Sequence, residues 1–397
     1  DLNQWPSHAG ENMEPKSLYL SKPWLKFYEP GVPAEPQVPL RSVPQVFDEA
    51  TEKFASKTAL IFYGREMSFR ELRELCDRFA AALAGLGVRK GDTVGLYLVN
   101  SPQFVIAYFG ALKLGAVVTP VSPVYTSHEV KFQLENAGAR VVICQDILYD
   151  KVARTGLALD HVIVTGVDEY LPTLKKFLAR TFIGKIFGEG GASPAQIPRA
   201  GNIHRFQELL AAAAARPPAV DIDPRTDLAA LPYTGGTTGY PKGVMLTHYN
   251  LLAAQVASTA AFPAFENGKE VIMAFLPFFH IYGQVVLMLN GLTCGNTLVM
   301  FTTPDTEAIL EAMEKYRATV FYGVPTLFEY LRDHKDTDKV NWRRLKLVLS
   351  GADTLHESTM TGWERRTGSR ITEGYGLSET AAASHINPRT RIKPGSF

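Results

Sequence analysis

The chain has few cysteines, almost no net charge and no uninterrupted apolar run long enough to cross a bilayer. Its three cysteines, Cys76, Cys144 and Cys294, are far apart and show no CxxC spacing, which indicates neither a disulfide framework nor a zinc site. We therefore expect a reducing, cytoplasmic compartment. With 41 basic and 40 acidic residues the net charge is +1, so nothing indicates nucleic-acid binding. The longest apolar run, 285–301, is broken by glycine and asparagine and predicts a buried helix followed by a strand.

From residue 42 onward, segments with helical periodicity alternate with short β-branched runs that glycines bound. The clearest of these pairs are helix 69–86 with strand 93–98, helix 102–114 with strand 116–120, and helix 127–137 with strand 140–144. Such alternation predicts right-handed βαβ crossovers and mainly parallel sheets. The predicted fold class is α/β, with two stacked βαβ-type lobes.

The composition also suggests how the chain is divided. Residues 1–41 are polar and proline-rich and predict an extended N-terminal arm. The Pro/Ala-rich stretch 211–224 predicts a junction between a first α/β lobe, 42–220, and a second, 221–397. Ligands of such folds bind beyond the carboxyl ends of the strands, so we expect a crevice where the lobes meet.

Residues 170–187 form a basic amphipathic insertion in the first lobe. Four cations in this segment surround a stripe of leucine, phenylalanine and isoleucine, and such a helix can lie on an anionic membrane surface. An ordinary helix that packs on its own protein explains the same pattern, and we favour that interpretation.

The run 233–243, YTGGTTGYPKG, combines glycines, threonines and one lysine. Glycines let backbone N–H groups approach an anion, hydroxyls add donors, and a lysine adds positive charge, so this run predicts a phosphate-binding loop. It does not match a Walker A loop, because Tyr240 stands where the second glycine is required and Gly243 follows Lys242. A surface turn is the alternative, but a turn needs fewer residues.

Three further segments carry chemistry of the same kind. The run 374–380, GYGLSET, offers an aromatic ring for stacking on a flat base, with a hydroxyl and a carboxylate for a magnesium-bound phosphate. The run 349–354, LSGADT, ends a strand with small residues, and 276–283, LPFFHIYG, places a histidine among aromatic residues. Taken singly, they are also explained as a helix start, a strand-to-helix loop and a core histidine.

Together, YTGGTTGYPKGVMLTH, LPFFHIYG and EGYGLSET resemble the signature motifs of the adenylate-forming superfamily of acyl-CoA synthetases, firefly luciferases and peptide-synthetase adenylation domains. The YTGGTTG form is most similar to that of fatty-acid–CoA ligases. The resemblance covers nearly the whole chain from residue 42, including the run GAVVTPVSPVYT that begins at Gly115.

The resemblance implies a role for each matching residue. Triphosphate binding is assigned to the loop that contains Thr234, Gly235, Gly236, Thr237, Thr238, Gly239 and Lys242. Adenine and phosphate contacts are assigned to Gly351, Ala352, Glu373, Gly374, Tyr375, Gly376, Ser378 and Glu379, with Tyr375 stacked on the base and Glu379 as the Mg²⁺ ligand. The acyl pocket is assigned to His280, Tyr282, Gly323 and Val324, and the catalytic residues are His280, Lys242 and Glu379. Ser378 stands where the family usually has threonine.

The resemblance implies ATP-dependent activation of a fatty acid to acyl-AMP, followed by transfer to coenzyme A. ATP, Mg²⁺, coenzyme A and a small carboxylic acid are the expected cofactors and substrates. Alternatives within the superfamily are an aryl-CoA ligase, a fatty-acyl-AMP ligase and a luciferase-like oxygenase, and an inactive nucleotide- or acyl-binding fragment is the alternative outside enzymes. The sequence does not determine which acyl chain length the site accepts or whether the chain forms a homodimer.

The chain ends where the family continues into a C-terminal lid domain that carries a further lysine. We therefore expect an incomplete large N-terminal domain, inactive or weakly active by itself.

Overall fold

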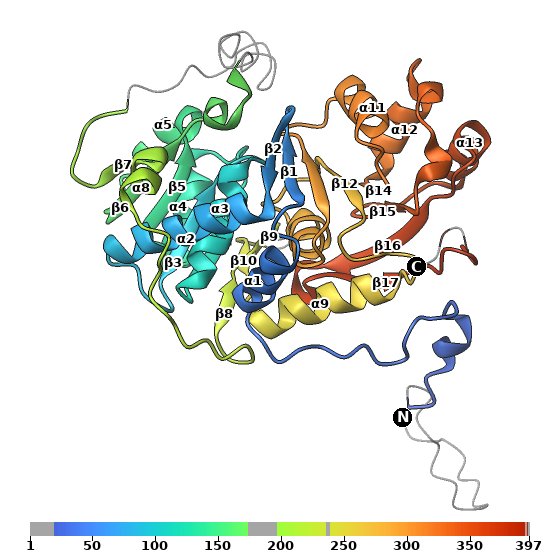
Figure 1. Cartoon of the computed structure of the whole chain (residues 1–397), viewed down its shortest axis with the longest axis horizontal. Helices are drawn as coiled ribbons and strands as arrows, with labels where there is room; N and C mark the ends of the chain where they lie inside the picture. The colour runs from blue at the N-terminus through green and yellow to red at the C-terminus, as the bar shows by residue number, and fades with distance from the viewer. Residues whose placement is uncertain (1–19, 174–196, 236–238, 394, 396–397) are drawn as a thin grey trace, which may run out of the picture.

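The computed structural model describes residues 20–173, 197–235, 239–393 and 395, and these residues form two large sheets and one short hairpin. The two sheets occupy different halves of the molecule (Figure 1). The predicted α/β class with mainly parallel sheets is confirmed. The predicted amphipathic helix lies almost entirely outside the described residues, and no described helix is long and apolar enough to span a membrane.

The first sheet has seven strands and is parallel except at one edge. Its order is β11 (Leu246–Thr247), β8 (Leu228–Ala230), β4 (Val117–Pro120), β3 (Thr93–Tyr97), β5 (Val141–Gln145), β6 (His161–Thr165) and β7 (Ile203–Arg205). Only the edge strand β11 pairs antiparallel to its neighbour within this sheet. The central strands are buried on both faces, as expected for parallel strands covered by helices.

The second sheet has eight strands, with an antiparallel strand at each edge. Its order is β17 (Ala382–Ile386), β16 (Thr372–Leu377), β15 (Leu347–Ser350), β14 (Val320–Gly323), β12 (Val271–Ala274), β13 (Thr297–Met300), β1 (Thr58–Phe62) and β2 (Arg65–Ser68). The edge strands β2 and β17 are antiparallel to β1 and β16. The short hairpin pairs β9 (Tyr233–Thr234) with β10 (Lys242–Gly243).

The sheets do not divide the chain at residue 220, where the sequence predicted a junction between lobes. β1 and β2 precede that point yet belong to the second sheet, while β8 and β11 follow it yet belong to the first. The physical reason is that an edge of each sheet is completed by a strand from the other part of the chain. β1 pairs with β13 in register from Leu60 to Phe62, and β8 pairs with β4.

Polar caps start the helices at the positions that the sequence signals. Ser68 accepts from the backbone N–H of Glu71 at the start of α2 (Phe69–Gly85), and Ser101 caps α3 (Pro102–Lys113), which begins with proline. The other helices are α1 (Val43–Lys53), α4 (Ser127–Asn136), α5 (Tyr149–Ala153), α8 (Phe206–Ala212), α9 (His248–Ala260), α10 (Asn290–Thr293), α11 (Thr306–Lys315), α12 (Pro325–Asp333) and α13 (Glu357–Thr367). The predicted helix boundaries are met within two residues.

One hydrophobic core joins the two halves. It contains Leu96 of the first sheet and Ile272 of the second, together with α3, whose residues 102–112 are all buried. Full burial of a large apolar side chain contributes about 1.5–3 kcal/mol, so this shared core holds the two sheets in fixed relation. The run predicted as a buried helix and strand forms a buried π-helix η4 (Tyr282–Leu289), the short α10 and strand β13.

Candidate active site

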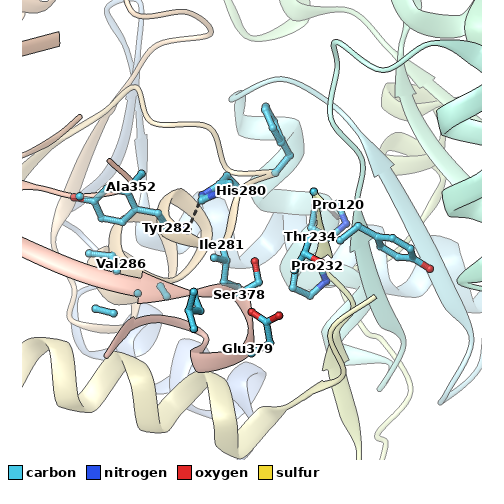
Figure 2. Close-up of a pocket in the computed structure, with 18 of the residues that line it drawn as sticks. Pro120, Pro232, Thr234, His280, Ile281, Tyr282, Val286, Ala352, Ser378 and Glu379 are labelled. Carbon is cyan, nitrogen blue, oxygen red and sulfur yellow. Dashed lines mark hydrogen bonds between the residues drawn. The ribbon is translucent and has the colours of Figure 1, made fainter. Parts of the chain in front are cut away.

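A cavity of about 810 Å³ lies where several strands of both sheets end. Pro120 ends β4 of the first sheet, Tyr322 lies near the end of β14, and Gly351 follows β15. The cavity thus occupies the carboxyl ends of parallel strands, where α/β folds bind ligands. Figure 2 shows Thr234 and Pro232 on one side of it and Ser378 and Glu379 facing them.

The hairpin β9–β10 brings the glycine- and threonine-rich loop to this cavity. Thr234 pairs with Lys242 across the hairpin, and the two residues line the cavity together with Gly235 and Gly239. The Lys242 side chain is exposed, and no ion pair involves it among the described residues. Gly236, Thr237 and Thr238 lie outside the described residues, so their predicted roles remain predictions.

Helix α4 supports this hairpin from the first half of the chain. The Tyr233 hydroxyl donates to Asn136 Oδ1 at 2.6 Å, and the Tyr240 ring stacks on Phe132 with centroids 5.1 Å apart. Both partners lie on α4. The hairpin is therefore held on both sides of its loop by contacts with residues about a hundred positions earlier.

The second segment with predicted phosphate contacts forms the end of β16 and the turn that follows it. Gly374, Tyr375 and Gly376 lie on β16, and Ser378 and Glu379 occupy the short helix η7 (Ser378–Thr380). All five line the cavity. A Cβ atom on Gly376 would lie 1.7 Å from the backbone oxygen of Ala382, so only glycine permits this close turn from β16 into β17.

The predicted adenine-binding surface is a groove of small residues beside Tyr375. Gly351 and Ala352 line the cavity after β15, and the Gly351 N–H donates to the carbonyl of Gly323 at 3.2 Å. Ala352 has a φ of 71°, a left-handed conformation that is unfavourable for a residue with a Cβ atom. The groove therefore contains stored backbone strain at a ligand-facing position.

His280 lies in the loop before the π-helix η4, and Asn100 fixes this loop. The Asn100 side chain is buried, donates to the Leu276 carbonyl at 2.8 Å and accepts from the Phe278 N–H at 2.7 Å. His280 Nδ1 accepts from the Tyr282 N–H at 3.3 Å, the dashed line in Figure 2. Desolvation by the surrounding protein lowers the pKa of His280, so the neutral imidazole is favoured at the cavity wall.

Tyr282 and Tyr322 form an aromatic pair in the cavity wall. Their ring centroids are 6.3 Å apart and the rings are nearly perpendicular. A Cβ atom on Gly351 would lie 3.3 Å from the Tyr282 ring, so the glycine allows this ring to rest against the backbone. Burial raises the pKa of both hydroxyls far above the ordinary range, and both tyrosines stay neutral.

Three predicted site residues do not line the cavity. Glu373 precedes the lining part of β16, and its carboxyl group is buried, so desolvation raises its pKa even though backbone N–H groups bond to it. Gly323 is covered by the Phe328 ring, which an added Cβ atom would approach to 2.8 Å. Val324 is the residue before α12 and packs against the core. For these residues the contact with base or acyl group stays a prediction.

The cavity is also lined by residues that have no individual role assigned from the sequence, some of them inside the quoted motifs. They are Pro120, Ser122, Tyr125, Gln133, Pro232, Ser258, Phe262, Phe279, Ile281, Val286, Tyr322, Leu349, Leu377, Ala382, Ala383 and Ile386. Pro120 at the end of β4 and Ser122 just after it lie at a strand end that the sequence predicted, and this position could have indicated that they line the site. The residues from α9, η4 and β17 are apolar or small and carry no signal that distinguishes them from core.

The cavity offers ligands that suit magnesium better than a transition metal. No group of three or more histidine, cysteine, aspartate or glutamate side chains is close enough to hold a metal within the described part of the chain. Glu379 supplies one exposed carboxylate, and Ser378 and Thr234 supply hydroxyls. Mg²⁺ is usually held by one or two carboxylates together with substrate phosphates and water, so this donor set fits it.

Comparison with known proteins gives a consistent result. A family model described as AMP-binding enzyme matches residues 47–396. The long-chain-fatty-acid–CoA ligase of Bacillus subtilis is 34% identical over 385 residues, which cover 96% of this chain and 68% of the relative. That of Salmonella typhimurium is 33% identical over 93% of this chain and 66% of the relative. The chain therefore spans about two thirds of the length of these relatives.

Solved structures share the fold. The crystal structure of a long-chain-fatty-acid–CoA ligase from Archaeoglobus fulgidus matches with a TM-score of 0.75 and 25% identity, over 92% of this chain and 69% of that one. The anthranilate CoA ligase AuaEII in complex with anthranoyl-AMP matches with a TM-score of 0.75 and 24% identity, over 90% and 63% of the chains. The family model across residues 47–396 and the relatives at 33–34% identity establish that the chain belongs to the AMP-binding enzymes, the adenylate-forming superfamily.

Proposed function

We propose that this chain carries the adenylation site of an ATP-dependent fatty-acid–CoA ligase, an AMP-forming acid–thiol ligase. One observation carries the proposal: a single cavity has a polar part and an apolar part. Thr234, Lys242 and Glu379 line the polar part, while Val286 and Phe262 belong to the apolar lining. A triphosphate and an alkyl tail require such neighbouring environments.

In the proposed first step, the fatty-acid carboxylate attacks the α-phosphorus of ATP, and the bond to the β-phosphate oxygen breaks to release pyrophosphate. A carboxylic acid with a pKa near 4.3 is already ionised at neutral pH, so no general base is required. The barrier lies in bringing one anion to another. Catalysis therefore depends on positioning and on neutralising charge.

Lys242 is suited to neutralise phosphate charge because its ammonium group is exposed beside the loop and has no ion-pair partner in the described ranges. Tyr375 and the groove at Gly351 and Ala352 are suited to hold the base. Glu379 would hold Mg²⁺, which supplies further charge neutralisation at the phosphates when it is bound. Loss of one preorganised donor of this kind typically costs about 3 kcal/mol of transition-state stabilisation.

In the proposed second step, the coenzyme A thiol attacks the acyl carbon of acyl-AMP. A carbon–sulfur bond forms, the thiol proton passes to solvent, the bond from the acyl carbon to the phosphate oxygen breaks, and AMP leaves with that electron pair. Neutral His280 is placed beside Tyr282 in the wall of the cavity, where it can contact the acyl carboxyl group. Its role is to orient that group between the two parts of the cavity.

The test uses binding and catalysis separately. Isothermal titration measures binding of lauroyl-sulfamoyl-adenosine, a stable mimic of acyl-AMP, to this chain, with benzoyl-sulfamoyl-adenosine as the comparison. We expect the lauroyl compound to bind much more tightly and to compete with ATP. Absence of binding would overturn the proposal, and preference for the benzoyl compound would support an aryl-CoA ligase instead. Acid-dependent exchange of pyrophosphate into ATP then tests for the reaction itself.

A further inference from the structure

A second hollow of about 270 Å³ lies beside the apolar part of the active-site cavity. Phe262 lines both spaces. Its side chain is 7% exposed, and its ring packs against Phe265 with centroids 5.3 Å apart. Phe265 lines the second hollow and is absent from the lining of the first. Phe262 is therefore a wall between two hollows, and Phe265 lies beyond that wall.

The apolar part of the cavity leads toward this wall. Ser258 of α9 and Phe262, four residues later, both line the cavity, as does Val286 of η4. α9 packs against η4 and against β17, so these three elements enclose the apolar part. In Figure 2, Val286 lies beyond Tyr282 and Ile281 as seen from Thr234. An alkyl group that starts near His280 and extends away from the phosphate loop therefore enters the part of the cavity that Ser258, Phe262 and Val286 line.

The N-terminal arm contributes to the wall of the second hollow. Glu29 and Pro30 line it together with Pro263 and Phe265. Its three charged residues already have partners: Lys346 forms a 2.7 Å ion pair with Glu270, Glu29 accepts from the Thr390 N–H at 2.7 Å, and Arg389 donates to the Lys346 carbonyl. Because these charged groups are paired, the proline and phenylalanine surfaces remain for an apolar occupant.

We propose that Phe262 sets the length of the acyl tail, because it ends the channel in the active-site cavity and separates it from a hollow that could hold further methylene groups. This inference rests on the proposed function. The occupant is the alkyl tail of the substrate, since Phe262 lines both the proposed acyl site and the second hollow, and no other described lining residue is common to the two. With Phe262 in place, a tail long enough to reach its ring binds no more tightly when further carbons are added.

The experiment measures dissociation constants for acyl-sulfamoyl-adenosines that carry octanoyl, decanoyl, lauroyl, myristoyl, palmitoyl and stearoyl groups. In the unmodified chain, affinity should rise by up to about fourfold for each buried methylene and then stop rising at one tail length. We call this tail length the break. Phe262→Ala should move the break to longer tails and leave octanoyl affinity unchanged within about twofold. Phe262→Leu is a milder variant for use if the alanine variant unfolds, and circular dichroism checks folding.

Two further variants control the interpretation. Phe265→Ala enlarges only the second hollow and should leave the break where it is in the unmodified chain. Ser258→Leu adds bulk to the apolar part of the cavity and should move the break to shorter tails. An unchanged break in folded Phe262→Ala and Phe262→Leu variants would overturn the inference alone, as would an equal shift in Phe265→Ala. If the unmodified chain binds none of the compounds, the proposed function fails and this inference with it.

Discussion

Asn100 provides a sharp test of how the fold positions the active site. It follows β3 of the first sheet, yet its side chain bonds to the loop of the second half that carries His280. Replacement by alanine removes both bonds and a longer one, from the side-chain amide to the Ala274 carbonyl at 3.5 Å, and leaves the Leu276 carbonyl and the Phe278 N–H without these partners. At about 1 kcal/mol for each bond, with a further penalty for unpaired buried groups, we expect a loss of about 2–4 kcal/mol in unfolding free energy.

The matched control is Asn296, another buried asparagine whose side chain bonds to the backbone. Its Oδ1 accepts from the N–H groups of Gly268 and Glu270, each at 3.1 Å, and neither of those residues lines the cavity. Asn296→Ala should therefore cost similar stability without disturbing the site. Asn100→Ala should in addition weaken binding of lauroyl-sulfamoyl-adenosine roughly tenfold, because the loop of His280 loses its anchor.

Urea unfolding gives the stability of each variant, and titration calorimetry gives its affinity under folding conditions. Asn100→Asp adds a third measurement, since it keeps the acceptor for Phe278 but turns a carboxylate toward the Leu276 carbonyl. It should be at least as destabilising as the alanine variant. Equal ligand affinity in Asn100→Ala and Asn296→Ala, at equal loss of stability, would refute the role of Asn100 in positioning the site.

The remaining predictions concern other parts of the same framework. Desolvation lowers the pKa of buried His248 from 6.5 to about 4, so the unfolded chain binds more protons than the folded chain between these pH values. The unfolding free energy present above pH 6.5 should therefore fall by roughly 3 kcal/mol as the pH drops toward 4. The urea midpoint should fall much less over this range in His248→Gln, and equal pH dependence of the two proteins would contradict the prediction. Gly283→Ala should lower the unfolding free energy by at least about 1–3 kcal/mol, because the new Cβ atom would lie 2.2 Å from the Pro277 oxygen. Gly201→Ala is the control: no atom lies within 4 Å of its new Cβ atom, so its thermal unfolding should change little. Lys242→Ala should leave the melting temperature unchanged because the side chain is exposed, and it should weaken ATP binding by roughly ten- to a hundredfold; unaltered affinity would remove Lys242 from the phosphate site.

Local sequence patterns predicted the elements well because their causes are local. Helix α2 begins after the Ser68 cap and ends within one residue of the predicted boundary, and α3 begins at the predicted proline. Strand pairing was harder to predict from the sequence. β1 and β2 join the second sheet through contacts between residues more than two hundred positions apart, such as Leu60 with Leu298, and local periodicity carries no information about such pairs.

The site was predictable where motifs carry distinctive chemistry and not where it is built from core residues. Lys242, Tyr375 and Glu379 were identified from their motifs and do line one cavity. Phe262 and Val286 were not, because an apolar side chain that faces a cavity has the same composition and helical spacing as one that faces the core. Glu373 was expected at the base; it is buried and does not line the cavity, so its contact with the base stays a prediction.

The described cavity depends on backbone geometry more than on reactive side chains. Ala352, Ala381 and Ala382 have φ values of 71°, 53° and 95°, all in a region that costs alanine roughly 1–2 kcal/mol. Such strain persists only where surrounding structure enforces it, and at Ala381 and Ala382 the tight turn between the paired strands β16 and β17 does so. A reaction whose nucleophile is already ionised gains little from a strong base and much from fixed distances between anions and their counter-charges. On this reasoning, rigid strand ends and the anchored loop of His280 matter more to the proposed adenylation than the pKa of any one side chain.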